Sequence, residues 1–260
     1  MGNKLDYGIQ AGMSTQTYSP IVELRRYTLH PGKRDTLIEI FDREFVETQE
    51  SVGIQVIGQF RNLDDPKQFV WLRGFHVMQA RAQSLHAFYS GPVWKAHCDA
   101  ANATMVDSDN VLLLRPAHPT SGFSFRKGNQ PSRGSRAKQD GSVSATIYYF
   151  HRPVDSGFIN YFENTMHPDL MEADASLLAY FVTEDSPNTF PGLPIREHEY
   201  VFVWFAGFQD QNAYESHLAR LEESKAWKEE ISRYLRRHIK GKPEVLRLTP
   251  TPRSWLTGKV

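Results

Sequence analysis

The sequence predicts an α+β protein built from two related modules that are fused head to tail. Three observations carry this prediction: a motif that recurs at a constant spacing, an order of strand and helix patterns that occurs twice, and a polar segment between the two halves. With 260 residues, the chain is long enough for two domains of ordinary size.

The internal repeat is clearest in one strand of each half. Residues 70–75 read VWLRGF and residues 203–208 read VWFAGF, so the second copy lies 133 positions after the first. The pair Trp94 and Lys95 recurs at the same spacing, as Trp227 and Lys228. At the module starts we align the two halves with a spacing of 122, because the second half has a longer loop over residues 187–199.

Composition divides the chain into four parts. We expect a poorly ordered lead-in over residues 1–19, the first module over residues 20–116 and a diverged second module over residues 143–252. Residues 117–142 are rich in Ser, Gly, Pro, Arg and Lys and have no apolar period, which is typical of a linker. We interpret this segment as a solubilising tether, with an anionic docking site as the alternative.

The strands of the first module follow from alternation and residue type. Residues 22–29 and 54–60 alternate between apolar and polar side chains, which predicts strands. Residues 69–75 are rich in aromatic and branched side chains and predict a third strand. A turn and cap over residues 107–110 precede the last strand, at 111–115.

The helices of the first module follow from apolar stripes. Residues 35–49 place Leu37, Ile38, Phe41 and Phe45 on one helical face. A second helix is predicted over residues 77–89, and a short third helix over residues 93–105 follows the break at Gly91 and Pro92. In the second helix, one stripe holds Met78, Ala82, Leu85 and Tyr89.

The second half repeats the order of the first. Its elements are predicted over residues 144–151, 156–171, 177–183, 200–208, 211–222, 225–238 and 244–248. The β-α-β-β-α-β order of each module is ferredoxin-like. Such a module covers one face of its sheet with its own helices and must bury the other face. The sequence therefore predicts an intrachain pseudo-dimeric α/β barrel, with two sheets face to face and the helices outside.

Several segments of the first half resemble the NIPSNAP family. They are residues 22–29 with Pro31, Gly32 and Lys33, residues 58–60 before 64–66, residues 69–75, residues 91–95 and residues 101–114. The resemblance is strong over residues 21–116 and weak in the second half. It implies the dimeric α/β-barrel superfamily, which contains monooxygenases, haem enzymes, isomerases and ligand-binding proteins. Fold-level analogy of this kind implies a pocket and no particular reaction.

Alternation along the strands selects the candidate binding residues. We expect the side of Val22 and Leu24 to pack on the helices, which would send the other face into the barrel. That other face carries Glu23, Arg25, Tyr27, Trp71 and Arg73. Glu23 would pair with one arginine, and the extra positive charge would favour an anionic ligand, most simply a carboxylate. The same residues also suit a structural ion-pair network without a ligand.

The two halves differ at these positions. At the assumed spacings, the second half keeps the aromatic residues as Tyr149 and Trp204. The three charged residues are replaced by Ala145, Ile147 and Ala206. This joint loss of charge indicates that one polar pocket is retained, in the first module.

If the protein is an enzyme, further residues become candidates for its active site. His97 follows Trp94 by about one helical turn, so both would face one site. Cofactor-free monooxygenases of the resembled superfamily use Asn, Trp and His groups, and Asn102, Trp94 and His97 are of these types. Tyr27 or His97 would then handle the proton. Trp94 also joins the predicted ligand-binding set.

Three functions stay open on this basis. The first is binding of a small, carboxylate-bearing molecule by the first module. The second is a cofactor-independent monooxygenase or isomerase, and the third is a protein-interaction module that acts through its surface or the basic linker. We expect no cofactor and no metal, because the ten histidines show no metal-ligand spacing.

Charge and cysteine content indicate which partners and which cellular compartment to expect. The formal net charge is zero, which argues against a nucleic-acid partner. Cys98 is the one cysteine, and no apolar run reaches the length of a membrane span, so we expect a cytoplasmic protein. Further pairing of whole chains into a homo-oligomer stays open.

Overall fold

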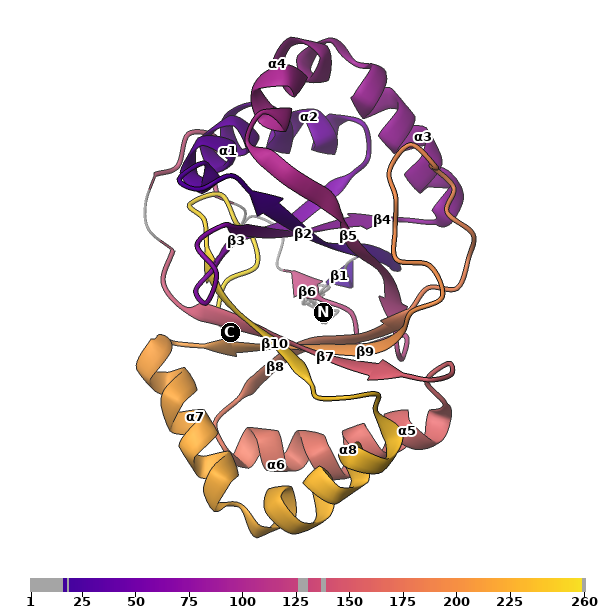
Figure 1. The fold of residues 1–260 in the computed structure, drawn as a ribbon, viewed down its shortest axis with the longest axis vertical. Helices are drawn as coiled ribbons and strands as arrows, with labels where there is room; N and C mark the ends of the chain where they lie inside the picture. Colours follow the sequence, from indigo (N-terminus) through magenta and orange to yellow (C-terminus); the bar gives the residue numbers. More distant parts are fainter. Residues whose placement is uncertain (1–15, 18, 126–130, 137–138, 259–260) are drawn as a thin grey trace, which may run out of the picture.

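Eight strands join edge to edge into a closed barrel, and the helices of the two modules lie at opposite ends of the view (Figure 1). The structure is a computed structural model that describes residues 16–17, 19–125, 131–136 and 139–258. The strand order around the barrel is β10-β3-β4-β2-β5-β8-β9-β7. The predicted intrachain α/β barrel of two tandem modules is therefore confirmed.

The first module contributes four consecutive strands of the barrel. They are β2 (Ile21–Leu29), β3 (Gln55–Asn62), β4 (Gln68–Phe75) and β5 (Met105–Pro116). Its helical segments are α1 (Arg34–Ile40), η1 (Phe41–Phe45), α2 (Val46–Ser51), α3 (Met78–Ser90) and α4 (Pro92–Asn102). The π-helical segment η1 lies inside the first predicted helix, whose apolar face is buried as expected.

The second module repeats this arrangement. Its strands are β7 (Ser142–Phe150), β8 (Ser176–Thr183), β9 (Tyr200–Phe208) and β10 (Glu244–Pro250). Its helical segments are α5 (Ser156–Tyr161), η2 (Phe162–Met166), α6 (His167–Glu172), α7 (Gln211–Glu223), η3 (Ala226–Ile231) and α8 (Ser232–His238). Each module has the strand pairing of a ferredoxin-like sheet.

Two pairings between modules close the barrel. Strand β5 pairs with β8, with Leu114 opposite Thr183, and β10 pairs with β3, with Leu248 opposite Asn62. All these pairings are antiparallel. Closure matters because each four-stranded sheet alone would leave two edges of unpaired backbone groups.

The barrel interior is filled by branched and aromatic side chains from both modules. Val22 and Leu24 on β2 lie in this interior cluster together with Ala145 and Ile147 on β7. The prediction that Val22 and Leu24 face the helices is therefore wrong, and Glu23, Arg25, Tyr27, Trp71 and Arg73 lie under the helices instead. The interior of an eight-stranded barrel is just wide enough for apolar side chains to fill, and here it holds aliphatic residues and phenylalanines, while these charged residues and the strand tryptophans lie in the layer between sheet and helices.

The segment between the modules takes part in this core. Strand β6 (Ser124–Phe125) pairs with β1 (Gln16–Thr17), and Phe123 and Phe125 belong to the barrel-interior cluster. Phe125 also lies against Trp255, at a centroid distance of 4.3 Å. This part of the predicted linker is therefore packed. Most of the predicted lead-in lies outside the described residues.

Two local predictions are also corrected. Residues 107–110, expected as a turn, belong to β5, which pairs with β2 through irregular register at this point. The buried stripe of α3 is Arg81, Ser84, Leu85 and Phe88. It shares Leu85 with the predicted stripe, but Arg81 and Phe88 are buried where Ala82 and Tyr89 were expected, because Arg81 points at a buried carboxylate. In the described part of the chain, no helix is long and apolar enough to cross a membrane.

We predict that Leu24→Ala lowers the free energy of unfolding by about 2–5 kcal/mol, because it opens a cavity in the filled barrel interior. The side chain of Leu24 is fully buried. Leu63→Ala is the control, since Leu63 is 45% exposed, and it should change stability by less than about 0.5 kcal/mol. Urea unfolding measures both, and equal losses would contradict the packing described.

Candidate functional site

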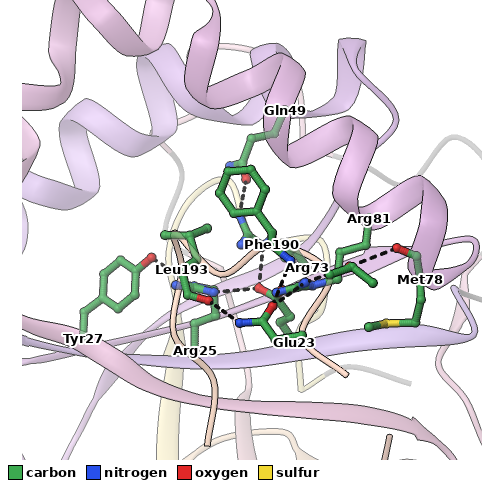
Figure 2. Close-up of polar contacts among 11 residues, drawn as sticks. Glu23, Arg25, Tyr27, Gln49, Arg73, Met78, Arg81, Phe190 and Leu193 are labelled. Carbon is green, nitrogen blue, oxygen red and sulfur yellow. Dashed lines mark hydrogen bonds and ion pairs between the residues drawn. The ribbon is translucent and has the colours of Figure 1, made fainter. Parts of the chain in front are cut away.

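A buried cluster of one carboxylate and three guanidinium groups lies between the first module's sheet and α3 (Figure 2). Glu23 Oε2 is 2.7 Å from Arg25 Nη1 and 2.7 Å from Arg73 Nε. Glu23 Oε1 is 2.6 Å from Arg81 Nε. Each of these side chains is at most 1% exposed, so the whole cluster is shielded from water.

Strand and helix geometry bring these four residues together. Glu23 and Arg25 are two positions apart on β2 and so share a face, and Arg73 on β4 lies directly opposite Glu23. Arg81 lies in the first turn of α3, on the helix face that covers β2 and β4. Glu23 therefore joins two strands and a helix through one carboxylate.

The cluster has more positive than negative charge. Within the described residues, Glu23 is the acidic partner of Arg25, Arg73 and Arg81 alike. The other hydrogen bonds of the arginines among the described residues are to neutral groups: Tyr27 Oη at 3.0 Å, Gln49 Oε1 at 3.5 Å, Asn188 Oδ1 at 3.0 Å and Thr189 Oγ1 at 3.2 Å. Nη2 of Arg73 and Nη2 of Arg81 are buried, and neither has a hydrogen-bond acceptor among the described residues.

The ionisation of the cluster reflects this imbalance. Burial by itself raises the pKa of Glu23, but the charges of Arg73, Arg25 and Arg81 outweigh burial and hold that pKa well below its usual range. Burial also lowers the pKa of Arg81, and Glu23 only partly offsets this effect. Glu23 is thus ionised at neutral pH, and its one negative charge is shared by three cations.

Aromatic faces stabilise part of the excess charge. The guanidinium carbons of Arg25 and Arg73 lie 5.6 and 5.1 Å from the ring centroid of Trp71. Arg25 also lies 5.4 Å from the ring of Tyr27. Such contacts contribute about 0.5–2 kcal/mol each, less than the cost of burying an unpaired charge.

A small cavity lies beside Tyr27 and Trp71, whose rings contact Arg25 and Arg73, but none of the four charged residues of the cluster lines it. Its volume is about 30 Å³, which is room for a water molecule or a monatomic ion. The residues around it include Tyr27, Phe45, Gln49, Trp71, Tyr89 and Trp94. Indole Nε1 of Trp71 is also buried without an acceptor among the described residues.

The second module closes this site with its long β8–β9 loop, residues 184–199, which runs alongside α3 in Figure 1. Asn188 and Thr189 accept hydrogen bonds from Arg81, and Phe190 stacks on Tyr89 at a centroid distance of 5.9 Å. Leu193 also packs on the first module's helix–sheet core, as Figure 2 shows. A loop that the sequence indicated only as a surface insertion is therefore part of the site.

The predicted site residues fall into three groups. Glu23, Arg25 and Arg73 form the ion cluster, and Tyr27, Trp71 and Trp94 line the adjoining cavity. His97 lies elsewhere, with Nε2 3.6 Å from Glu44 Oε2 and about a third of its side chain exposed. It does not line the cavity, so Tyr27 and His97 are not brought together.

Sequence reasoning missed Arg81, Gln49 and the loop residues. Arg81, Ser84, Leu85 and Phe88 have helical spacing, so a stripe with a polar end could have indicated Arg81. Nothing local could have placed residues 188–193 on the other module, because that contact depends on how the barrel closes.

The structure also corrects the alignment of the first strand in each module. Glu23 lies opposite Arg73, and Ser144 lies opposite Ala206, so Ser144 is the equivalent of Glu23. By the same pairing, Thr146 matches Arg25 and Tyr148 matches Tyr27, at a spacing of 121. The second module has therefore lost the charges, as predicted, but on β7 they are replaced by the polar Ser144 and Thr146 and not by the apolar Ala145 and Ile147, and Tyr148 takes the place expected for Tyr149.

The comparisons identify the first module. Residues 22–119 match the family model described as NIPSNAP, which confirms the resemblance for this half. A search of curated proteins found no match.

Similar solved structures span both modules. A proposed monooxygenase from Fusobacterium nucleatum is 11% identical, with 90% of this chain and 93% of that chain covered, at a TM-score of 0.53. An anthrone oxidase-like protein is 14% identical, with 92% and 96% covered, at 0.53. A proposed monooxygenase from Lactobacillus acidophilus is 15% identical, with 89% and 94% covered, at 0.51. These identities establish a shared fold alone.

We predict that Glu23→Gln destabilises the protein by about 3–5 kcal/mol at neutral pH, because it leaves three buried cations without their counter-charge. Asp35→Asn is the control: Asp35 pairs with Arg61 but is 70% exposed, so its loss should cost at most about 1 kcal/mol. Urea unfolding at pH 7 compares them, and similar losses would contradict the role given to Glu23.

The effect of Glu23→Gln should depend on pH in one direction. The folded pKa of Glu23 lies below its unfolded value of about 4.3, so its stabilising effect is complete above that pH and is lost as pH falls towards the folded pKa. The stability difference between parent and variant should therefore shrink below about pH 4. A difference that grows on acidification would contradict this assignment.

Asp42 on η1 should have the opposite pH dependence. Burial raises its pKa to about 7, against the lowering effect of Arg253 and Arg61. A raised folded pKa means that the carboxyl destabilises the fold as pH rises from about 4 towards 7. We predict that Asp42→Asn is more stable than the parent at pH 8 and no more stable at pH 4, measured by thermal unfolding.

Proposed function

We propose that the first module binds a small anion, or the carboxylate of a small molecule, between β2, β4 and α3. The observation that carries the proposal is the buried excess of guanidinium groups, with two Nη2 donors that lack acceptors. The proposal keeps the carboxylate-binding function expected from the sequence and moves it from the barrel interior to the layer between sheet and helices.

The energetics of burial support an anion. An unpaired ion inside a protein costs several kcal/mol, and a buried donor without an acceptor costs about 1–3 kcal/mol. A bound anion would offset both costs, because it supplies charge and acceptors together. Arginine suits this role, since its planar fork presents donors in pairs to a carboxylate.

The cavity limits what the closed form can hold. Its volume of about 30 Å³ would accept a monatomic ion but no organic acid, and neither Arg73 nor Arg81 lines it, so an anion at their Nη2 donors would need neighbouring side chains to move. A larger ligand would need the 184–199 loop to move, which would release the contacts of Asn188, Thr189 and Phe190 with the first module. Loops of this length commonly act as lids over binding sites.

An enzyme remains the second candidate. The fold is shared with proposed monooxygenases, and the hydroxyl of Tyr27 accepts a hydrogen bond from Arg25 beside the cavity. A cofactor-independent monooxygenase or isomerase would use this hydroxyl, without His97. Anion binding needs fewer assumptions than catalysis, so it is the function that we propose.

The proposal predicts that small anions stabilise the parent protein in a saturable way. Thermal unfolding would be followed in sodium gluconate, with chloride, bromide, acetate or benzoate substituted at constant ionic strength. A ligand at about 100 times its dissociation constant should add about 2.7 kcal/mol of stability. Arg73→Gln should lose this effect, because it removes one cation and one unpaired donor.

Two further variants serve as the control and the alternative for this test. Arg43→Ala removes an arginine that is 61% exposed, and it should keep the full anion effect. If Arg73→Gln does not fold, Arg81→Lys keeps the charge but removes the fork, and it should show a weaker effect. Equal stabilisation of the parent and of every folded cluster variant would refute binding at this site.

A further inference from the structure

We propose a second binding site, in the second module, for an uncharged aromatic molecule that carries a hydroxyl group. The site is the cavity between strands β7 and β9 and helices α7 and α8. It is separate from the anion site of the first module and does not depend on that proposal.

The cavity lies at the position equivalent to the ion cluster. Its volume is about 450 Å³, within the range of small-molecule pockets. Ser144 and Thr146 line it where the first module has Glu23 and Arg25, and Tyr214 lines it at the repeat position of Arg81. Small side chains on the strands thus leave open the space that guanidinium groups fill in the first module.

The inner wall carries a hydrogen-bond donor without a partner. Trp204 is 5% exposed, and its Nε1 is buried without a hydrogen-bond acceptor in good geometry among the described residues, although the hydroxyl of Tyr148 lies close to it. A buried N–H without an acceptor costs about 1–3 kcal/mol, which a ligand oxygen would recover. Trp204 lines the cavity, so a molecule inside could supply that oxygen.

The helix side supplies an acceptor. His217 lines the cavity and is 2% exposed, and its Nδ1 lies 2.8 Å from the carbonyl oxygen of Ala173. A carbonyl can only accept, so Nδ1 carries the proton, and burial lowers the pKa of His217 and favours the neutral ring. Nε2 is then the acceptor of the ring, and it suits a hydroxyl donor.

The remaining lining selects the ligand class. Tyr148, Leu221 and Trp227 add apolar and aromatic surface that suits a flat ring system. The charged lining residues are Glu222, Arg236 and Lys242, and all three are exposed. An ionised group deep in this cavity would find no counter-charge among its buried lining residues, so an uncharged molecule is favoured.

The test uses isothermal titration of the full chain with 2-naphthol as the probe. We expect one site, weaker binding of 2-methoxynaphthalene, which has no donor, and much weaker binding of 2-naphthoate, which is charged. Trp204→Phe keeps the ring but removes the N–H, and it should weaken 2-naphthol binding about 5-fold to 10-fold.

Leu218→Trp tests the location. Leu218 lines the cavity but is 41% exposed, so a larger side chain there should fill the cavity without disturbing the core, and should abolish binding. Val106→Trp, at a first-module position that is 60% exposed, is the matched control and should bind as the parent does.

Three results would overturn the proposal. They are no binding of 2-naphthol up to its solubility limit, unchanged affinity in Leu218→Trp, or tighter binding of 2-naphthoate than of 2-naphthol. Sodium chloride should not compete with 2-naphthol, which separates this site from the anion site of the first module.

Discussion

The first module depends on a single buried carboxylate. Glu23 joins β2, β4 and α3 through ion pairs with Arg25, Arg73 and Arg81, and its partner Arg81 also holds the loop of the second module at Asn188 and Thr189. Buried ion pairs add little stability relative to apolar packing, but removing one partner is costly. The cluster therefore fixes where helix, sheet and loop lie, and leaves a positive charge that the described protein groups do not balance.

The two modules share one backbone arrangement, but their equivalent sites differ in charge and in cavity size. Trp71 and Trp204 occupy equivalent strand positions, and both have a buried Nε1 without an acceptor in good geometry among the described residues, although the hydroxyl of Tyr148 lies close to that of Trp204. Around Trp71, guanidinium groups fill the layer and the cavity is small. Around Trp204, short polar residues leave a cavity that is much larger. Divergence of a few side chains, within the same pairing of strands, accounts for the difference.

The sequence predicted the barrel, the repeat and the members of the ion cluster other than Arg81. These follow from signals that are local or exactly repeated, such as alternation, apolar stripes and the recurring tryptophan motif. It did not predict which face of β2 enters the barrel, because both Leu24 and Glu23 are fully buried and alternation alone cannot tell two buried faces apart. The same ambiguity allowed the spacing of 122 in place of 121, and a shift of one residue exchanges the faces of a strand. The contact of the 184–199 loop with Arg81 joins residues more than 100 positions apart and depends on barrel closure.

The central claim is that an anion balances the buried arginines of the first module. Anomalous diffraction from crystals grown in sodium bromide tests it most directly, because a bound bromide ion is located by its own scattering. The account predicts an anomalous peak within hydrogen-bonding distance of Nη2 of Arg73 or Arg81, beneath the 184–199 loop. An ordered cluster without such a peak, in which both Nη2 atoms donate to protein groups or water, would contradict it.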